Sequence, residues 1–179
     1  GFALVVGDNR PHKNLAVLAA AWIRLGASPP LLLVAAGPVD PRFPGLPELA
    51  RAAGTSAVHL GRLAEAELAW LYRNATLVLF PSLYEGFGSP LVEAFEHGVP
   101  AIASDIPVFR EIAAGAACLV APDKPEAWAG EVSRLVADRD ARERLNAAGR
   151  RRAAEMTYER TAQGVLGLLR EAAGGGSTA

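Results

Sequence analysis

The chain has 179 residues, a length that fits one domain with a substantial hydrophobic core. Apolar residues make up 51% of it and charged residues 21%, a composition that is typical of a globular protein and excludes a disordered one. The formal net charge is −1, from 18 basic and 19 acidic residues, so we expect no nucleic-acid partner and interpret the basic run 150–152 as a solvated helix face.

The sequence also limits the covalent and membrane chemistry of the chain. Because Cys118 is the only cysteine, a disulfide bond within the chain is excluded. Its apolar neighbours predict a buried thiol rather than a nucleophile. No apolar run approaches the ~20 residues that span a bilayer. The chain starts without methionine and directly with a predicted strand, so we expect it to be a piece of a longer protein.

Short apolar runs alternate with amphipathic stretches along the whole chain. In chain order we predict strand 3–6, helix 13–25, strand 31–36, helix 46–53, strand 58–60, helix 65–74, strand 77–80, helix 90–96, strand 101–103, helix 108–113, strand 117–120, and helices 125–137, 141–155 and 157–173. This alternation predicts an α/β fold, with a Rossmann-like, mostly parallel sheet and helices on both faces. Residues 1–173 would form one domain, followed by a flexible tail at 174–179.

The loop after strand 77–80 is the most informative stretch, because parallel sheets bind ligands at the carboxyl ends of their strands. Gly86 and Gly88 let the backbone approach a ligand closely. Ser89 suits the N-cap and Pro90 the first helical position. This helix start would aim backbone N–H groups at an anion such as a diphosphate, namely those of Ser89, Leu91 and Val92. Alternatively, these residues form only a tight turn and a cap.

Two carboxylates flank this helix start. Glu85 lies in the loop, where it could contact a sugar, and Glu93 lies in the helix, where it could accept hydrogen bonds from ribose hydroxyls. Alternatively, Glu93 only complements the helix dipole. Two glutamates around one strand–loop–helix unit are a more specific pattern than two glycines and a cap.

At this point the sequence resembles the retaining glycosyltransferases of the GT-B fold, in the large family 4 group. That family carries a Glu, seven residues and a second Glu, which correspond here to Glu85 and Glu93. The surrounding matches are Leu68 to Tyr72, Phe80-Pro81-Ser82, Glu85-Gly86-Phe87-Gly88, Pro90, Glu93-Ala94, Gly98-Val99-Pro100 and Ala103-Ser104-Asp105. The resemblance continues to Glu111 and on through Arg142 and Thr161, so it covers nearly the whole chain.

The resemblance implies two Rossmann-like domains that face each other across a cleft. The C-terminal domain binds the nucleotide-sugar donor and the N-terminal domain mostly binds the acceptor. This chain resembles only the former, so the missing acceptor domain is its expected partner. The helix at 157–173 resembles the segment that crosses back to that domain, which predicts a partly exposed apolar face at Val165, Leu166, Leu168 and Leu169. Alternatively, that face packs entirely on this domain.

The same resemblance implies roles for individual residues. Glu85 would contact hydroxyls of the donor sugar, and Glu93 would bind the ribose. The sugar and phosphates would be held at Gly86 and by backbone amides of Phe87, Gly88, Leu91 and Val92. The reaction would retain the configuration at the anomeric carbon and need no metal and no cofactor besides the donor.

The loop at 7–14 supports this interpretation. The family has a glycine here, matched by Gly7, and a lysine that binds the diphosphate, matched by Lys13. Cations are disfavoured at helix starts, so a purely structural lysine is a weaker explanation. Many members carry an arginine directly after the glycine, where this chain has Asp8, and Arg10 is the candidate substitute. His12 is expected to be exposed.

Two other loops match the family less closely. Gly37 precedes proline where members often show Gly-X-Gly, which leaves the contacts of that loop open. Arg62 lies in a segment whose backbone runs near the base in the family. It either stacks on the base or reaches a phosphate, or it is an ordinary surface residue.

Together these features predict a hexosyltransferase in which Glu85 and Lys13 are the catalytic residues. The segment 59–63 resembles the mannosyltransferase branch, which favours GDP-mannose as the donor over a UDP-sugar. We expect a cytoplasmic protein of polysaccharide biosynthesis that reaches the inner membrane face only through its missing half. The isolated chain is expected to be inactive.

Three alternatives remain open. The chain could be a non-catalytic nucleotide-sugar binding module. It could be a sugar-nucleotide epimerase of GT-B-like architecture, although the spacing of Glu85 and Glu93 argues against this. It could be a glycoside hydrolase with two carboxylates, but a hydrolase would leave Lys13 and the capped helix unexplained.

Overall fold

The computed structural model describes residues 1–174, except for the side chains of residues 158, 159, 161, 173 and 174. The elements in chain order are β1 (Phe2–Val6), the 3-10 turn η1 (Pro11–Lys13), α1 (Leu15–Arg24), β2 (Leu32–Ala36), α2 (Leu46–Ala52), β3 (Ala57–His59), α3 (Glu65–Asn74), β4 (Leu77–Phe80), α4 (Ser89–His97), β5 (Ala101–Ser104), α5 (Pro107–Ala113), β6 (Cys118–Val120), α6 (Pro125–Ala137), α7 (Arg139–Glu155) and α8 (Tyr158–Gly174). The tail predicted at 174–179 lies outside the described residues, apart from Gly174, which ends α8.

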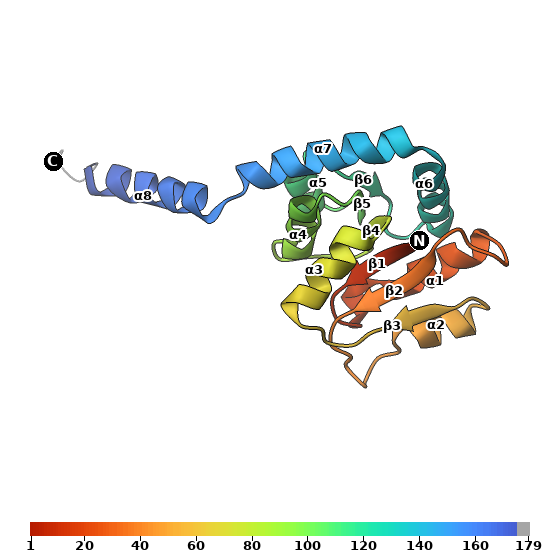
Figure 1. Cartoon of the computed structure of the whole chain (residues 1–179). Coiled ribbons are helices and arrows are strands. Elements are labelled where there is room, and N and C mark those ends of the chain that lie inside the picture. The colour runs from red at the N-terminus through yellow and green to blue at the C-terminus, as the bar shows by residue number, and fades with distance from the viewer. Residues whose placement is uncertain (175–179) are drawn as a thin grey trace.

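The strands form one six-stranded sheet in the order β3-β2-β1-β4-β5-β6, and every neighbouring pair is parallel (Figure 1). The predicted α/β fold with a parallel sheet is therefore confirmed. From β1 the chain adds β2 and β3 on one side, and it then returns to place β4 on the other side of β1, followed by β5 and β6. The direction in which strands are added therefore reverses between the neighbours β1 and β4. Such a reversal splits the loops that follow the two strands and creates the crevice where doubly wound sheets bind ligands.

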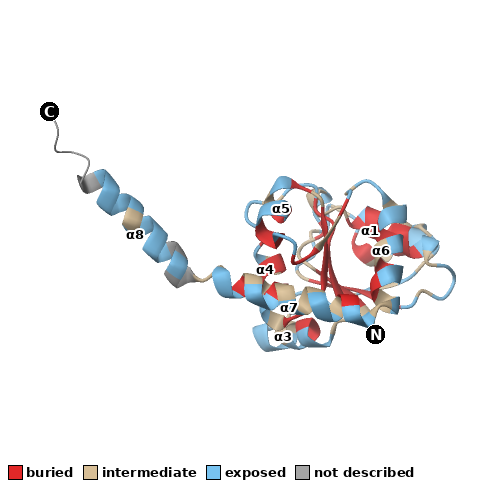
Figure 2. Cartoon of the chain, turned by 90° about the horizontal axis from the view of Figure 1, so that it is seen from above, coloured by how far each residue is buried: buried red, intermediate tan, exposed pale blue. Residues whose placement is uncertain are grey.

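Helices cover both faces of the sheet, and each face has its own hydrophobic core. Alternate residues of β1 point to opposite sides. Leu4 packs in the core that includes Phe95 of α4 and Phe109 of α5. Ala3 packs in the opposite core, whose largest members are Trp22 of α1 and Trp128 of α6. Figure 2 shows these buried positions as a band along the sheet and the inner sides of the helices. The two cores fix the sheet between its helix layers and so fix the loops at its edge.

The first helix begins later than predicted. Pro11–Lys13 forms a 3-10 turn, and Asn14 then adopts a left-handed conformation with φ of 53° before α1 starts at Leu15. Pro11 fixes the first residue of the turn, and an asparagine tolerates the left-handed region better than most residues. The consequence is that Lys13 lies at the end of a tight turn rather than inside a regular helix.

At the predicted solvated face 150–152, Arg150 and Arg151 are exposed as predicted, whereas Arg152 is partly buried. Arg152 donates from Nε to the carbonyl of Ile112 at 2.8 Å and from Nη2 to that of Glu111 at 2.8 Å. Arg150 donates to the carbonyl of His97 at 3.3 Å. These carbonyls lie near the C-terminal ends of α5 and α4, where a cation is favoured. Arg150 and Arg152 therefore link α7 to the C-terminal ends of α4 and α5.

The last helix, α8, extends away from the rest of the chain (Figures 1 and 2). Its apolar side chains are exposed, with 67% of Leu168 and 60% of Leu169 accessible to solvent. The predicted exposure of this face is confirmed, and packing of the whole face on this domain is excluded for the chain as it stands.

Candidate functional site

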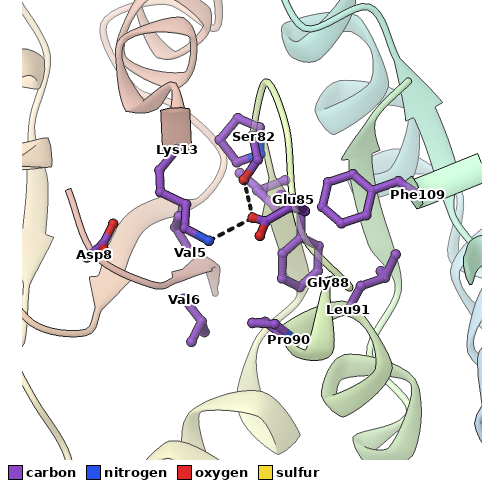
Figure 3. A pocket seen from close by; sticks show the side chains of 13 residues that line it. Val5, Val6, Asp8, Lys13, Ser82, Glu85, Gly88, Pro90, Leu91 and Phe109 are labelled. Carbon is purple, nitrogen blue, oxygen red and sulfur yellow. Dashed lines mark hydrogen bonds and ion pairs between the residues drawn. The ribbon is translucent and has the colours of Figure 1, made fainter. Parts of the chain in front are cut away.

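The loops after β1 and β4 meet at the reversal point of the sheet and enclose a pocket (Figure 3). The first loop contributes Asp8 and Lys13, and the second contributes Ser82, Glu85 and Gly88. The floor is apolar, made by the ends of the two strands and by side chains of the adjoining helices. The two candidate catalytic residues, 72 positions apart in the sequence, thus line the same pocket.

The centre of the pocket is an ion pair. The Nζ atom of Lys13 lies 2.7 Å from Oε1 of Glu85, and both side chains are mostly buried, with 17% and 15% exposed. Ser82, itself buried, donates from Oγ to the same Oε1 atom at 2.7 Å (Figure 3). The sequence motif includes Ser82 but does not predict a role for it. Its hydroxyl holds the Glu85 carboxylate in place independently of the lysine.

Asn14 holds the loops around this ion pair together. Its Nδ2 atom donates to the carbonyl of Pro81 at 3.1 Å and to that of Pro122 at 2.8 Å. The residue thereby ties the turn that carries Lys13 to the loop that follows β4 and to the loop that follows β6. The sequence contained no signal for these contacts beyond the lysine–asparagine pair, because they join residues 67 and 108 positions apart.

Asn9 plays the same part for the loop after β2. It is 3% exposed, its Nδ2 atom donates to the carbonyls of Asp40 at 3.0 Å and Phe43 at 2.7 Å, and its Oδ1 atom accepts from the amide of Asp40 at 2.6 Å. This side chain therefore links the loop after β1 to the loop after β2.

We expect Asn9→Ala to lower the free energy of unfolding by about 2 kcal/mol, because it removes these bonds and leaves buried groups without partners. The matched control is Asn74→Ala at an exposed asparagine whose side chain donates to the carbonyl of Trp70 within α3. The control should change stability by less than about 0.5 kcal/mol. Urea denaturation of both variants measures this difference, and equal losses would contradict the assigned role of Asn9.

The start of α4 differs from the prediction. Gly88, with φ of 84°, is the N-cap, and Ser89 is the first helical residue, so the expected Ser89 cap is wrong. A Cβ atom on Gly88 would lie 2.9 Å from the ring of Phe109, so the backbone passes close to α5 at a point where a side chain does not fit. Position 88 therefore favours glycine, because of this close contact and because of its left-handed backbone conformation.

This shift changes which amides face outward at the helix start. The amide of Leu91 donates to the carbonyl of Gly88 at 2.9 Å. Pro90 has no N–H group, so the amides left for a ligand by the helix geometry are those of Gly88 and Ser89. The predicted ligand contacts of Ser89, Leu91 and Val92 all stay predictions.

The Glu93 side chain contacts α3, so it does more than complement the dipole of α4. The hydroxyl of Tyr72 donates to its Oε2 atom at 3.1 Å. Glu93 is partly accessible to solvent, whereas Tyr72 is fully buried. The sequence motif around 68–72 contained Tyr72, but nothing in its spacing assigned it to the carboxylate.

A second hollow continues from the central pocket along the ends of β1 and β2. It is lined by the last residues of β1 and β2, the loops that follow β1, β2 and β3, and one residue of α3, namely Val6, Gly7, Ala36, Gly37, Pro38, Arg62, Leu63 and Leu68. The amide of Gly7 donates to Ala36 at 3.0 Å and that of Gly37 to Gly61 at 2.8 Å, so successive loops are joined by backbone bonds. Arg62 is exposed at the margin of this hollow, so stacking on the base, contact with a phosphate and a surface role all stay open.

The polar side chains at the outer margin of the site are engaged with one another. Arg10 is largely exposed, and its Nε atom lies 3.4 Å from the Asp8 carboxylate. His12 stacks on Tyr84 with 4.9 Å between ring centroids, so the expectation of a simply exposed histidine is wrong. Gly86 and Phe87 form the exposed tip of the loop between β4 and α4.

Cys118 is half-buried. Burial, followed by the nearby Glu131 carboxylate, raises the pKa of its thiol to about 12. A thiol with that pKa stays protonated at neutral pH and is unreactive. The raised pKa supports the predicted inert thiol, whereas its burial is only partial.

Among residues 1–174, no helix combines the length and apolar character needed to cross a bilayer. In the same described part of the chain, His, Cys, Asp and Glu side chains do not gather in threes around a point that could hold a metal ion.

Comparison with known proteins decides the family. The model of the family described as glycosyl transferases group 1 matches residues 1–152 of the chain. The chain belongs to this family. The resemblance expected from the two glutamates and their surroundings is thereby confirmed.

Curated group 1 relatives include bacterial mannosyltransferases. O-antigen chain mannosyltransferase B from Escherichia coli is 30% identical over 164 residues, which cover 89% of this chain and 43% of that protein. D-inositol 3-phosphate glycosyltransferase from Rhodococcus erythropolis is 34% identical over 173 residues, which cover 82% of this chain and 39% of that protein. The chain therefore spans less than half of the length of these relatives.

Solved structures show the same fold. Sucrose-phosphate synthase from Thermosynechococcus elongatus superposes with a TM-score of 0.82 at 25% identity, over 97% of this chain and 46% of that one. The C-terminal domain of a group 1 family glycosyl transferase from Francisella tularensis superposes with a TM-score of 0.72 at 24% identity, over 86% of this chain and 84% of that domain. This group 1 chain thus has the fold of a GT-B C-terminal domain.

Proposed function

We propose that the chain is the donor-binding half of a retaining hexosyltransferase that acts on a nucleotide-diphosphate sugar. The observation that carries the proposal is the Lys13–Glu85 ion pair, which places a cation and a carboxylate 2.7 Å apart at the reversal point of the sheet. The ammonium group would neutralise charge on the diphosphate, and the carboxylate would accept hydrogen bonds from the sugar hydroxyls. A binding site for only one of these groups would leave the other charge unexplained.

In the proposed complex, the diphosphate replaces Glu85 as the partner of Lys13. Departure of the sugar builds negative charge on the diphosphate, and a preorganised ammonium group together with the amides of Gly88 and Ser89 stabilises that charge. Lys13 is largely shielded from water in its pocket, so its electrostatic effect on the leaving group is stronger than at an exposed surface.

Glu85 then orients the sugar. Ser82 continues to hold its Oε1 atom after Lys13 has turned to the diphosphate, because that hydrogen bond does not depend on the lysine. Sugar hydroxyls can donate to Oε2, and the negative charge favours the positive charge that develops on the sugar. Glu93 accepts hydrogen bonds from the ribose of the nucleotide.

GDP-mannose is the proposed donor. The support comes from mannosyltransferases among the relatives, including the Escherichia coli protein that matches 89% of this chain. The acceptor would bind to an N-terminal domain of the same enzyme, with the exposed face of α8 as the segment that reaches it. The proposed location is the cytoplasm, where nucleotide sugars are made.

We expect Glu93→Ala to weaken binding of GDP to this chain about tenfold, because two hydroxyl donors of the ribose lose a charged acceptor. Calorimetric titration of the chain measures the change. The matched control is Glu96→Ala, an exposed glutamate one turn further along α4, which should leave GDP affinity unchanged. Equal affinities of the Glu93 variant and the unchanged chain would contradict the ribose assignment.

Transfer itself is tested in the two-domain enzyme. The anomeric configuration of the product, followed by NMR from GDP-mannose, should match that of the donor. An inverted product would contradict a retaining mechanism. Transfer by the isolated chain alone would contradict the proposal that this half only binds the donor.

A further inference from the structure

A buried tyrosine stands behind the candidate ribose ligand. Tyr72 of α3 is 1% exposed, and its hydroxyl lies 3.1 Å from Oε2 of Glu93 and 3.4 Å from the carbonyl of Pro90. The carboxylate offers the shorter contact and carries the charge, so it is the stronger acceptor of the single hydroxyl proton. The carboxylate belongs to α4 and the hydroxyl to α3, so the contact joins the two helices.

Packing also holds the aromatic ring of Tyr72 in place. It stacks on His97, in the last turn of α4, with 5.2 Å between ring centroids and 18° between ring planes. Apolar side chains of the same core surround it, among them Phe95. Because the ring is fixed by this packing, the position of its hydroxyl is fixed too.

The hydroxyl remains a donor under physiological conditions. Burial, followed by the negative charge of Glu93, raises the pKa of Tyr72 well above its usual value. A tyrosine that served only to fill the core could be a phenylalanine, since the hydroxyl must find a partner when it is buried. Here the partner is the one carboxylate of α4 that the proposed function uses.

We propose that Tyr72 is a positioning residue for ribose recognition, holding the Glu93 carboxylate by its Oε2 atom so that Oε1 is presented to the ribose hydroxyls. This inference rests on the proposed function, in which Glu93 binds the ribose. A glutamate side chain has several rotatable bonds, and ordering them before the ligand arrives reduces the entropy lost on binding. The hydroxyl of Tyr72 does this without touching the nucleotide.

The test compares nucleotides that differ only in the ribose. GDP and UDP, each with its 2′,3′-dideoxy counterpart, are titrated into the chain and into Tyr72→Phe. We expect the unchanged chain to prefer the ribose form, and Tyr72→Phe to bind that form about fivefold to tenfold more weakly while its affinity for the dideoxy form stays within about twofold. Phenylalanine keeps the ring and the stack on His97, and thermal unfolding verifies that the variant is folded.

Two controls separate positioning from packing. Tyr84→Phe removes the hydroxyl of an exposed tyrosine, and we expect it to leave the ratio of ribose to dideoxy affinity unchanged. In the Glu93→Ala background, Tyr72→Phe should have no further effect on affinity for the ribose form, because the residue acts only through that carboxylate.

The outcomes point to different failures. Equal weakening of both nucleotide forms by Tyr72→Phe, or full additivity with Glu93→Ala, would show a merely structural tyrosine and overturn this inference alone. If the unchanged chain binds ribose and dideoxy forms equally, the role of Glu93 in the proposed function is wrong, and the inference falls with it.

Discussion

Lys13→Ala should lower the rate of glycosyl transfer by the two-domain enzyme about 10²- to 10³-fold, the loss that follows removal of one preorganised group from developing charge. The ammonium group lies 2.7 Å from Glu85 and is mostly shielded from water, so bulk ions replace it poorly. The variant also leaves the Glu85 carboxylate facing the diphosphate without a compensating cation. Steady-state kinetics with GDP-mannose measures the effect.

The control is the other lysine of the chain. Lys124 is exposed at the start of α6, and Lys124→Ala should leave turnover within about twofold of the unchanged enzyme. We expect the fold to survive in the Lys13 variant because Ser82 still holds Glu85. A variant that folds normally and keeps full turnover would remove Lys13 from the mechanism.

Gly37→Ala should lower the free energy of unfolding by more than about 3 kcal/mol, the range of severe overpacking and backbone strain. A Cβ atom on Gly37 would lie 2.1 Å from the carbonyl oxygen of Gly7, and the residue has φ of 145°. Backbone atoms on the neighbouring loop cannot rotate away as a side chain would. The substitution therefore forces apart the loops that follow β1 and β2, next to the site.

Gly54→Ala is the control that lacks a steric clash, so its difference from Gly37→Ala gives the steric part of the loss. Gly54 also has a positive φ, 81°, but a Cβ atom there meets no atom within 4 Å. We expect it to cost about 1 kcal/mol from backbone strain alone. Urea denaturation of the two variants gives the difference, and similar losses would show that close approach of the two loops does not constrain position 37.

The sequence predicted the elements of the site better than their contacts. Strand 77–80 and helix 65–74 have the predicted bounds, because their apolar patterns and flanking residues are local signals. The family motif located Glu85 and Lys13, but their direct ion pair depends on the strand order, which brings the loops after β1 and β4 together. Strand order is a property of the whole chain and is not written in either loop.

The missed residues share this long-range character. Asn9, Asn14 and Tyr72 act through bonds to residues between 21 and 108 positions away, and a lone asparagine or tyrosine carries no local pattern for such contacts. The N-cap of α4 shows the opposite case, in which a local preference was overridden. Ser89 has the better capping side chain, yet close packing with Phe109 required Gly88 at that position.

The central claim, that Lys13 and the start of α4 form a nucleoside diphosphate site, is tested most directly by calorimetric titration of this chain with GDP, UDP and ADP. Lys13→Ala and Lys124→Ala are titrated in parallel. We predict that GDP binds with the highest affinity and that binding weakens at least about tenfold in the Lys13 variant only, because that variant loses a charged contact to the diphosphate. Binding of no diphosphate by the chain, or equal binding by both lysine variants, would contradict the claim.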